Sequence, residues 1–292
     1  MVKITIDARM INHSGIGTYI RSLVPNLVNK YNLILLGDRE ILTKFNWSET
    51  VRIIDCRSSI YSVREQLEIP LKIPSCDIFI CPHYNVPLLP VRAEKKIVLI
   101  HDVYHLAFSN QLSLPQKIYS RFLINYAVNH FDQIITISRF SESEIVRYTG
   151  IKREKLTVLY PGFDFKSVEL NKDKEDAIRK KYGLPERFIL FVGNIKPHKN
   201  LKNLLLAYKI LIDRNIKIGM VATGKKEGFI VSDEGIKTIM NENKILADNV
   251  VFTGYIDGDQ LPAIYKMADV FVFPSFYEGH NPDPFLHQDF LN

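Results

Sequence analysis

The first half of the chain alternates short runs of apolar and β-branched residues with longer stretches in which apolar residues recur at helical spacing. The short runs predict strands at residues 2–6, 33–37, 51–54, 77–81, 96–100, 133–137 and 156–160. The longer stretches predict helices at residues 17–29, 58–68, 115–129 and 141–149. The last of these helices is expected to begin at Ser141, because Glu144 three residues later completes a capping-box pattern.

The pattern stops at Tyr160-Pro161-Gly162, and the Lys-, Glu- and Asp-rich residues 165–187 contain no strand-like run. This change predicts a domain boundary near residues 162–185. Beyond it, we expect strands at residues 188–192, 216–222, 250–253 and 269–273. Helices are expected near residues 200–213, 234–245 and 258–267, the first with a one-sided apolar stripe.

Regular alternation of strand and helix is typical of parallel sheets joined by right-handed crossovers. With 292 residues, 46% of them apolar, the chain is long enough for two cores of about 150 residues each. We therefore expect an α/β fold of two facing Rossmann-like domains, at residues 1–163 and 164–292.

Composition excludes several classes of protein. Charged residues make up 24% of the chain, which favours a soluble globular protein over a disordered one, and the apolar runs are too short for a membrane span. The N-terminus enters a strand at once, so we expect no signal peptide and a cytoplasmic location. The odd number of cysteines, without a Cys-x-x-Cys pair, favours buried thiols at Cys56, Cys76 and Cys81.

The formal charge of +6 is unevenly distributed along the chain. Residues 1–160 contain 20 Lys and Arg against 14 Asp and Glu, whereas residues 161–292 contain 18 of each. A solvated surface is enough to explain so small a surplus of positive charge. The surplus also favours peripheral contact of the N-terminal domain with an anionic membrane. We expect no nucleic-acid partner.

Two strand-to-helix crossings about 180 residues apart carry glycines, at Gly15-Ile16-Gly17 and at Gly193. Glycine at such a crossing lets backbone N–H groups and a helix N-terminus face an anion, although an ordinary tight turn is the alternative. Ile20 stands where a dinucleotide fingerprint has its third glycine, which argues against a nicotinamide or flavin site. The second crossing adds Lys196 and Lys199, which predict either a site for a diphosphate leaving group or a solvated basic loop.

Two further candidates follow predicted strands. His101 comes directly after strand 96–100, where a histidine points into the ligand crevice of an open parallel sheet and exchanges protons near pH 7. A purely structural histidine is the alternative. Glu278 lies just beyond strand 269–273, where a carboxylate can accept hydrogen bonds from sugar hydroxyls.

Together, these motifs resemble the retaining, nucleotide-sugar-dependent glycosyltransferases of family 4, which have the GT-B architecture, and within it a bacterial mannosyltransferase-like branch. The matching stretches run in order over roughly residues 1–279. They are Gly15-Ile-Gly-Thr-Tyr, Tyr61-Ser-Val-Arg-Glu-Gln, Ile100-His101-Asp102, Ile137-Ser138-x-x-Ser141, Tyr160-Pro161-Gly162, Val192-Gly193-x-x-x-Pro197-x-Lys199-Asn200, Gly254-Tyr255 and Ala268-Asp269-Val-Phe-Val-Phe-Pro274-Ser275-x-Tyr277-Glu278-Gly279.

The resemblance implies roles for residues at matching positions. Lys199 matches the lysine that holds the donor diphosphate, and Lys196 shares the charge because Asn194 stands where many relatives carry arginine. His101 matches the histidine near the transferred sugar and the acceptor, and Glu278 matches the first glutamate of the Glu-x7-Glu motif. The implied donor-binding residues are Gly15, Gly17, Gly193, Asn194, Lys196 and Lys199, and the implied catalytic residues are His101, Asp102 and Glu278.

Residues 280–292 depart from the family pattern. The second glutamate of the motif, which holds the ribose in relatives, falls at Leu286, and relatives continue for about two more strands and several helices. In a sheet of order 3-2-1-4-5-6, the four expected strands lack the edge pair. We therefore expect an incomplete second domain, typical of a truncated or frame-shifted reading frame, with Val270 and Val272 less buried and transfer near background.

The resemblance implies an enzyme that moves a hexose, mannose first, from a nucleoside-diphosphate sugar to a glycan or lipid-linked acceptor with retention of configuration. It places that reaction in surface polysaccharide and lipopolysaccharide biosynthesis, with no metal and no cofactor besides the donor substrate. Two alternatives stay open: an inactive truncated remnant or binding module, and a nucleotide-sugar epimerase on the same architecture.

Overall fold

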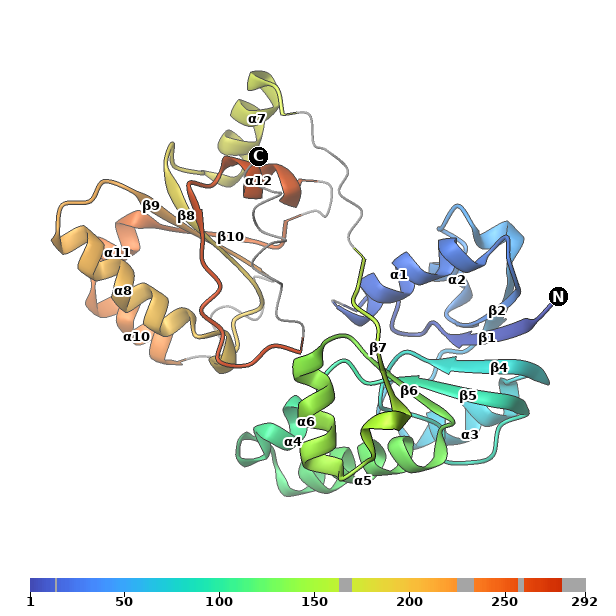
Figure 1. Cartoon of the computed structure of the whole chain (residues 1–292). Coiled ribbons are helices and arrows are strands. Elements are labelled where there is room, and N and C mark those ends of the chain that lie inside the picture. The colour runs from blue at the N-terminus through green and yellow to red at the C-terminus, as the bar shows by residue number, and fades with distance from the viewer. Residues whose placement is uncertain (14, 163–169, 225–233, 257–259, 280–292) are drawn as a thin grey trace. The chain divides into compact units, whose positions relative to one another are not determined.

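The computed structural model describes residues 1–13, 15–162, 170–224, 234–256 and 260–279. The chain divides into two compact units, the first Met1–Phe163 with Gly279–Asn281 and the second Asp164–Glu278 with Pro282–Asn292. Each unit is built on its own sheet, and every strand pairing described is parallel (Figure 1). The expected α/β class with two parallel sheets is confirmed.

The first unit contains a seven-stranded sheet of order β3-β2-β1-β4-β5-β6-β7. All seven expected strands are present: β1 Lys3–Asp7, β2 Asn32–Gly37, β3 Arg52–Asp55, β4 Cys76–Cys81, β5 Ala93–Leu99, β6 Gln133–Thr136 and β7 Leu156–Val158. The chain crosses from β3 to the far side of β1 to form β4. This reversal creates a topological switch point, where ligands bind outside the carboxyl ends of the strands of open parallel sheets.

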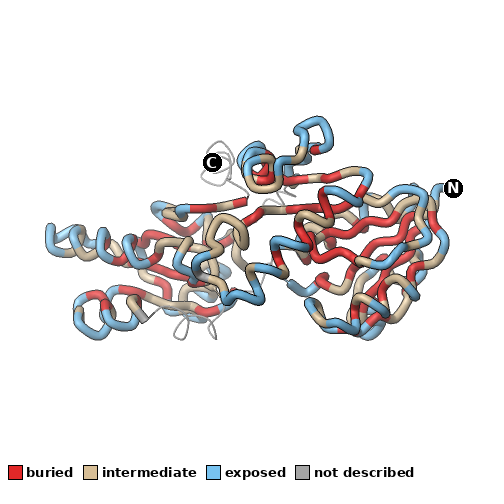
Figure 2. The backbone as a smooth tube through the Cα atoms, turned by 90° about the horizontal axis from the view of Figure 1, so that it is seen from below, coloured by how far each residue is buried: buried red, intermediate tan, exposed pale blue. Residues whose placement is uncertain are grey.

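Helices cover both faces of this sheet. They are α1 Ile16–Leu27, α2 Arg39–Leu42, α3 Val63–Lys72, α4 Tyr104–Ala107, α5 Leu114–His130 and α6 Arg139–Thr149, with 3-10 turns η1 Ser48–Thr50, η2 Ser109–Gln111 and η3 Arg153–Lys155. Buried residues of α1 and α2 pack on one face, and those of α3, α5 and α6 pack on the other (Figure 1). The strands between these layers are largely buried (Figure 2), which explains their continuous apolar runs.

Two helix starts in the first unit differ from the expectation. The predicted helix 58–68 begins at Val63, because Ser62 accepts a hydrogen bond from the Glu65 N–H and caps the helix there. The predicted cap at Ser141 is wrong, because α6 begins at Arg139 and the Ser138 hydroxyl accepts the Ser141 N–H at 3.0 Å. Ser141 is therefore inside the first turn, and its own N–H is the group that is capped.

The second unit contains a four-stranded sheet of order β10-β9-β8-β11. Its strands are β8 Phe188–Val192, β9 Gly219–Thr223, β10 Val250–Gly254 and β11 Val270–Phe271. Its helices are α7 Lys172–Tyr182, α8 Leu201–Asp213, α10 Glu234–Glu242, α11 Lys244–Asn249 and α12 Leu261–Met267, with the 3-10 turn η4 Pro197–Lys199. Helices α8, α10 and α11 pack on one face of the sheet, and α7 and α12 pack on the other (Figure 1).

Several details of the second unit correct the sequence-based expectation. The charged stretch after residue 165 contains helix α7, which Asn171 caps and Gly183 ends with a left-handed conformation. The expected helix 234–245 is divided into α10 and α11 at Asn243, and the last strand is only two residues long.

Strand β11 pairs with β8 alone among the described strands, and the Val270 side chain is 48% exposed, as expected. Val272 is partly buried and packs against the core beneath α8. Residues 257–259 of the expected helix 258–267, and the tail 280–292 with Leu286, lie outside the described residues.

Among the described residues, no helix has the length and apolar character needed to cross a bilayer. The three cysteines are free and buried, as their odd number predicted. Burial raises the pKa of each thiol, and Cys81 is affected most.

Candidate functional site

Three loops of the first unit gather polar side chains at its switch point. The loop after β1 supplies Arg9, the loop after β4 supplies His83, and the loop after β5 supplies His101. Because β1, β4 and β5 are adjacent and parallel, their carboxyl ends lie at the same edge of the sheet. The topology therefore places these side chains at the edge where parallel sheets bind ligands.

The glycine loop at the start of α1 needs both of its glycines. Gly15, the residue before the helix, has φ = 75°, a left-handed conformation that side chains disfavour. A Cβ on Gly17 would lie 2.3 Å from the Ile11 carbonyl oxygen, and the Gly17 N–H donates to the His13 oxygen at 2.9 Å. The loop folds tightly onto its own backbone, so its glycines are explained by local packing as well as by the proposed ligand.

His101 is held in one orientation by its neighbours. Its Nε2 lies 3.1 Å from the Pro82 carbonyl oxygen, and its ring makes an edge contact with Tyr19 of α1 at 5.5 Å. Burial lowers the pKa of His101 below its usual value, more than the Pro82 carbonyl and Asp102 raise it. The ring is therefore neutral at pH 7 and, because the carbonyl takes the Nε2 proton, Nδ1 carries the lone pair.

Asp102 and the α6 serines complete the surroundings of His101. The Asp102 carboxylate accepts the Tyr104 N–H at 3.0 Å and so fixes the start of α4. The Ser141 hydroxyl lies 2.7 Å from the His101 carbonyl oxygen and 2.6 Å from that of Gly279, a residue grouped with the first unit. A Cβ on Gly279 would lie 2.7 Å from that of Asp102, so this approach requires glycine.

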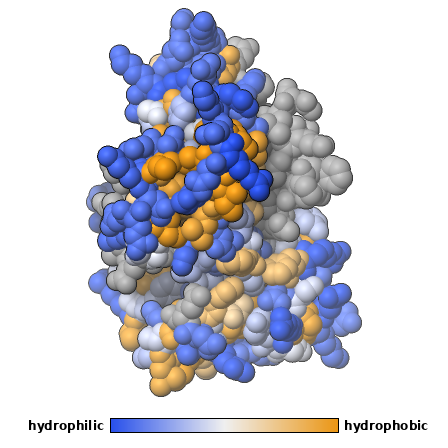
Figure 3. Space-filling model, turned by 90° about the vertical axis from the view of Figure 1, so that its left-hand side faces the viewer, coloured by the Kyte–Doolittle hydropathy of each residue, from blue (hydrophilic) through white to orange (hydrophobic). Residues whose placement is uncertain are grey.

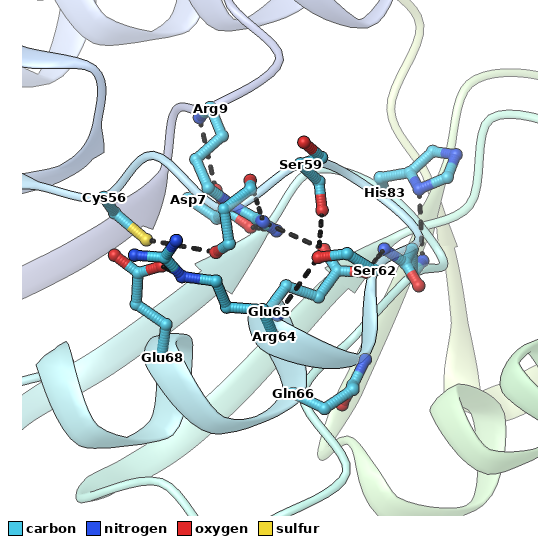
Figure 4. Close-up of polar contacts among 12 residues, drawn as sticks. Asp7, Arg9, Cys56, Ser59, Ser62, Arg64, Glu65, Gln66, Glu68 and His83 are labelled. Carbon is cyan, nitrogen blue, oxygen red and sulfur yellow. Dashed lines mark hydrogen bonds and ion pairs between the residues drawn. The ribbon is translucent and has the colours of Figure 1, made fainter.

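Arg9, Asp7 and Glu65 form a buried ionic cluster at the carboxyl edge of the same sheet (Figure 4). The Arg9 guanidinium contacts Asp7 Oδ2 and Glu65 Oε2, each at 2.8 Å, and all three side chains are at most 6% exposed. Burial alone would lower the pKa of Arg9, but the two carboxylates outweigh it and raise that pKa. Asn85 extends the cluster by donating to Glu65 Oε1 at 2.8 Å.

His83 is also held neutral. Its Nδ1 accepts the Asn85 N–H at 3.1 Å, and its Nε2 lies 3.3 Å from the Tyr61 hydroxyl. Burial lowers the pKa of His83 to about 3, and the nearby His101, His105, His13 and Arg9 add to the effect. Protonation of Nδ1 would also remove the acceptor that the Asn85 N–H requires.

The second unit has its own switch point, between β8 and β11. The loop 193–200 follows β8, and residues 272–278 follow β11. Two hydrogen bonds join these segments: the Asn200 side chain donates to the Pro274 oxygen at 3.0 Å, and the Phe276 N–H donates to the His198 oxygen at 2.8 Å. Helix α8 begins immediately after the loop, so its N-terminal N–H groups lie beside Lys199.

Lys199 and Glu278 form an ion pair between Nζ and Oε1 at this switch point. Both side chains are mostly buried, at 19% and 15% exposure, and Lys199 Nζ also lies 5.5 Å from the centre of the Phe273 ring. Gly193 lies close to the Lys199 stem, since a Cβ added there would be 3.9 Å from Cδ. Asn194 is partly buried and Lys196 is exposed on the same loop.

The structure thus places the predicted site residues in two groups. Gly193, Asn194, Lys196, Lys199 and Glu278 belong to the second unit, and Gly15, Gly17, His101 and Asp102 belong to the first. Glu278 was predicted to be catalytic, and within its unit it contacts the lysine predicted to bind the donor. Among the described residues, no group of three His, Cys, Asp or Glu side chains could hold a metal ion.

Sequence reasoning missed Arg9, Glu65 and His83. A signal existed for two of them, because Arg9 follows Asp7 at the end of the first strand and Glu65 lies in the stretch Tyr61-Ser-Val-Arg-Glu-Gln. Neither pattern reveals that the two side chains meet, since they are 56 residues apart.

Comparison with known proteins places both units in recognised families. Residues 14–167 match the family described as Glycosyltransferase Family 4, and residues 174–280 match Glycosyl transferases group 1. The first of these matches alone covers more than half of the chain.

Among similar curated proteins is the serotype-specific mannosyltransferase WbdA of Escherichia coli, 27% identical over 208 residues. That alignment covers 70% of this chain and 24% of WbdA. The O-antigen chain mannosyltransferase RfbU of Salmonella typhimurium is 24% identical over 82% of this chain and 61% of its own length. The chain therefore spans only part of the length of these relatives.

Similar solved structures show the same fold. Anabaena HepE in complex with UDP and glucose has a TM-score of 0.72 at 14% identity, over 96% of this chain and 76% of HepE. Sucrose-phosphate synthase from Thermosynechococcus elongatus has a TM-score of 0.71 at 17% identity, over 97% of this chain and 77% of its own. The architecture is GT-B, and the chain belongs to glycosyltransferase family 4.

Proposed function

We propose that this chain transfers a hexose, mannose first, from a nucleoside-diphosphate sugar to a glycan or lipid-linked acceptor, with retention of anomeric configuration. The two curated relatives named above are mannosyltransferases, one of them of the O-antigen chain, which supports this donor sugar and a role in surface polysaccharide biosynthesis. The observation that carries the proposal is the Lys199–Glu278 pair at the N-terminus of α8.

The second unit supplies the chemistry that departure of a nucleoside diphosphate requires. Negative charge accumulates on the diphosphate as the glycosidic bond breaks, so preorganised positive charge lowers the barrier. Lys199 offers an ammonium group held in place by Glu278, Lys196 offers a second from the same loop, and α8 adds its N-terminal N–H groups. Glu278 holds Lys199 and has a second carboxylate oxygen that can accept hydrogen bonds from sugar hydroxyls.

The first unit supplies a neutral imidazole for the acceptor side. With its Nε2 proton directed to the Pro82 oxygen, His101 offers Nδ1 as a hydrogen-bond acceptor for a hydroxyl group. We assign His101 and Asp102 to the surroundings of the transferred sugar, and Gly15 and Gly17 to close approach of backbone to the donor. Retention requires the new bond to form on the face of the sugar from which the diphosphate leaves. We therefore assign to these groups the role of orienting the donor and the acceptor on that face.

The same proposal includes peripheral contact of the first unit with an anionic membrane. Three large apolar side chains spaced four residues apart on α5, Leu114, Ile118 and Phe122, are 69%, 62% and 54% exposed. The helix carries Lys117 and Arg121 and no acidic residue. An apolar stripe with flanking cations is the pattern by which helices lie on anionic bilayers, whose surface potential attracts the charge.

Exposed apolar side chains alone do not define such a surface. Leu206 and Ile210 on α8 and Ile245 on α11 are also exposed, and on the face drawn in Figure 3 apolar patches alternate with hydrophilic ones. Helix α8, however, carries Asp213 paired with Lys209, so its charges partly cancel. We therefore assign the membrane contact to α5, because all of its charged residues are positive.

The proposal is tested first by nucleotide binding. Titration calorimetry of the full chain with GDP and UDP should show that Lys199→Ala weakens binding by about 2–3 kcal/mol, or roughly 30- to 150-fold. Lys202→Ala, which removes an exposed lysine from the first turn of α8, should bind like the wild type. Glu278→Gln should bind these diphosphates at least as tightly, because it releases the Lys199 ammonium.

Equal affinities of the wild type and Lys199→Ala for these nucleotides would show that Lys199 does not contribute to the binding site. A second measurement follows transfer from GDP-mannose to lipid-linked glycans and determines the configuration of the product. An inverted product would contradict the retaining reaction.

A further inference from the structure

A pocket of about 390 Å³ lies in the first unit, within the size range of small-ligand sites. Six of the residues that line it carry polar groups: Tyr61, Tyr84, His105, Gln116, Tyr119 and Ser120. They come from the segments after β3, β4 and β5 and from the first half of α5, so the pocket belongs to the carboxyl edge of the sheet. Leu112 and Pro115 also line it.

Aromatic rings form the body of this pocket. Tyr61 makes an edge contact with Tyr119, with ring centres 6.1 Å apart, and lies 6.4 Å from Tyr84. The Tyr84 ring in turn lies 5.5 Å from His105. The pocket therefore offers several flat apolar faces at different angles within the reach of one small molecule.

The hydroxyl groups of these rings are joined by long hydrogen bonds. Tyr61 Oη lies 3.4 Å from Tyr84 Oη and 3.3 Å from His83 Nε2, and Tyr84 Oη lies 3.4 Å from His105 Nδ1. Hydrogen bonds from hydroxyl groups are usually about 2.7–2.8 Å long, so these contacts are weak and a ligand hydroxyl can replace them at little cost.

Tyr119 is anchored differently. Its hydroxyl donates to Asn85 Oδ1 at 2.9 Å, and Asn85 donates to Glu65 of the buried ionic cluster. Burial raises the pKa of Tyr119 to about 12, so its hydroxyl stays protonated at neutral pH.

Tyr61 adopts an unusual backbone conformation. Its φ is 66°, in the left-handed region that an aromatic residue rarely adopts. Its side chain is nevertheless 47% exposed, so core packing does not explain the strain. The conformation directs the ring into contact with Tyr84 and Tyr119 at the wall of the pocket.

We propose that this aromatic pocket binds a neutral pyranose ring of the acceptor glycan. A pyranose has an apolar face of C–H groups and a rim of hydroxyls, which match flat tyrosine faces edged by hydroxyl, imidazole and amide groups. The inference rests on the proposed function, because it assigns the acceptor side of that reaction to a place in the first unit.

The lining favours a sugar over the lipid part of the acceptor. A polyprenyl chain has no hydroxyls with which to replace the hydrogen bonds among Tyr61, Tyr84 and His105, whereas a sugar has several. None of the described residues that line the pocket is a lysine or an arginine, which disfavours a phosphate. A neutral sugar ring satisfies both observations.

The test is ligand-detected NMR of the full chain with methyl α-mannopyranoside and a mannobiose. Tyr61→Leu removes the ring and should weaken sugar binding about tenfold, whereas Tyr61→Phe keeps the ring and should weaken it about threefold or less. Leucine and phenylalanine meet the same backbone strain as tyrosine at this φ, and the position is half-exposed. The fold should therefore be retained in both variants. Tyr160→Leu changes a more exposed tyrosine of the same unit, one that is not among the described lining residues of the pocket, and should bind sugar like the wild type.

GDP affinity, measured in the same samples, separates this inference from the proposed function. GDP binding without sugar binding by the wild type would overturn the pocket assignment alone. Sugar binding that depends on Tyr61, in a chain that binds no nucleoside diphosphate, would support the pocket and contradict the transfer reaction. Binding of farnesyl phosphate that is lost in Tyr61→Leu, with no sugar binding, would overturn the pyranose assignment in favour of the lipid.

Discussion

The surroundings of two histidines in the first unit determine their protonation states. His101 and His83 are neutral because burial opposes protonation, and each has one ring nitrogen engaged by backbone. In His101 the nitrogen bonded to backbone is a donor, whereas in His83 it is an acceptor. The two histidines therefore respond differently to substitution and to pH.

We predict that His101→Ala lowers the rate of sugar transfer about 100-fold or more, because it removes the nitrogen proposed to orient the acceptor hydroxyl. Single-turnover transfer from GDP-mannose measures the effect. His101→Gln, which can still donate to the Pro82 oxygen, should keep the melting temperature near that of the wild type while activity stays low. His130→Ala, at an exposed histidine of α5, is the matched control. A lost cooperative melt in His101→Gln would instead identify His101 as purely structural.

The lowered pKa of His83 predicts how the stability of the folded chain depends on pH. Its folded pKa is about 3 and its unfolded pKa is about 6.5, so between these values the unfolded chain binds a proton that the folded chain does not. Stability should therefore fall as pH decreases below about 6.5. Melting temperatures at pH 7, 6 and 5 should fall less steeply in His83→Asn, whose side-chain oxygen can still accept the Asn85 N–H. His130→Asn should follow the wild type, and parallel slopes in all three proteins would refute the assignment.

At the scale of secondary-structure elements, buried charge joins the end of β1 to α3. Arg9 follows β1, and Glu65 lies in the first turn of α3, capped by Ser62. The pair holds the start of α3, and with it the backbone around Tyr61, against the carboxyl edge of the sheet. Local capping determines where the helix begins, and the ion pair determines where it is anchored.

Arg9→Met should destabilise the first unit by about 3–5 kcal/mol, because it leaves two buried carboxylates without their cation. Denaturant unfolding followed by circular dichroism measures this change. Arg57→Met provides the control, since Arg57 contacts Asp38, Glu40 and Asp55 on the surface and should matter much less. Similar losses in the two variants would show that burial of the Arg9 cluster adds nothing.

At the scale of the whole molecule, the two units carry different parts of the proposed function. The second unit carries the positive charge proposed to hold the donor diphosphate, and the first carries the neutral histidines and the aromatic pocket. All of the surplus positive charge along the chain falls in residues 1–160. This distribution supports membrane contact through the first unit, whereas donor binding by the second unit rests on the local charge of Lys199 and Lys196.

We predict that the chain sediments with vesicles of phosphatidylglycerol and phosphatidylethanolamine but not with phosphatidylcholine alone. The double variant Ile118→Asp with Phe122→Asp should lose this binding, because it places carboxylates in the apolar stripe of α5. Ile210→Asp, at a similarly exposed position of α8, should bind like the wild type. Added salt should weaken binding, because screening reduces the attraction of Lys117 and Arg121 to anionic lipid. Retention of binding by the α5 double variant would exclude this helix as the contact.

Much of the fold could be predicted from the sequence because the signals for it are local. Buried parallel strands read as continuous apolar runs, so all seven strands of the first sheet and the four of the second were located. Helix boundaries were less accurate, since Ser138 and Ser141 are both suitable caps and only the path of the chain out of β6 decides between them. Helix α7 was missed because its highly charged residues resemble a linker.

For the candidate site, the sequence by itself determined which loops follow buried strands and carry glycine, lysine or histidine. The tertiary structure decided what those side chains contact, because the partners are distant along the chain: Arg9 meets Glu65 across 56 residues, and Lys199 meets Glu278 across 79. It also decided the charge state of His83 and the shape of the aromatic pocket. Burial and hydrogen bonding set these properties, and both arise only when separate strands and helices pack together.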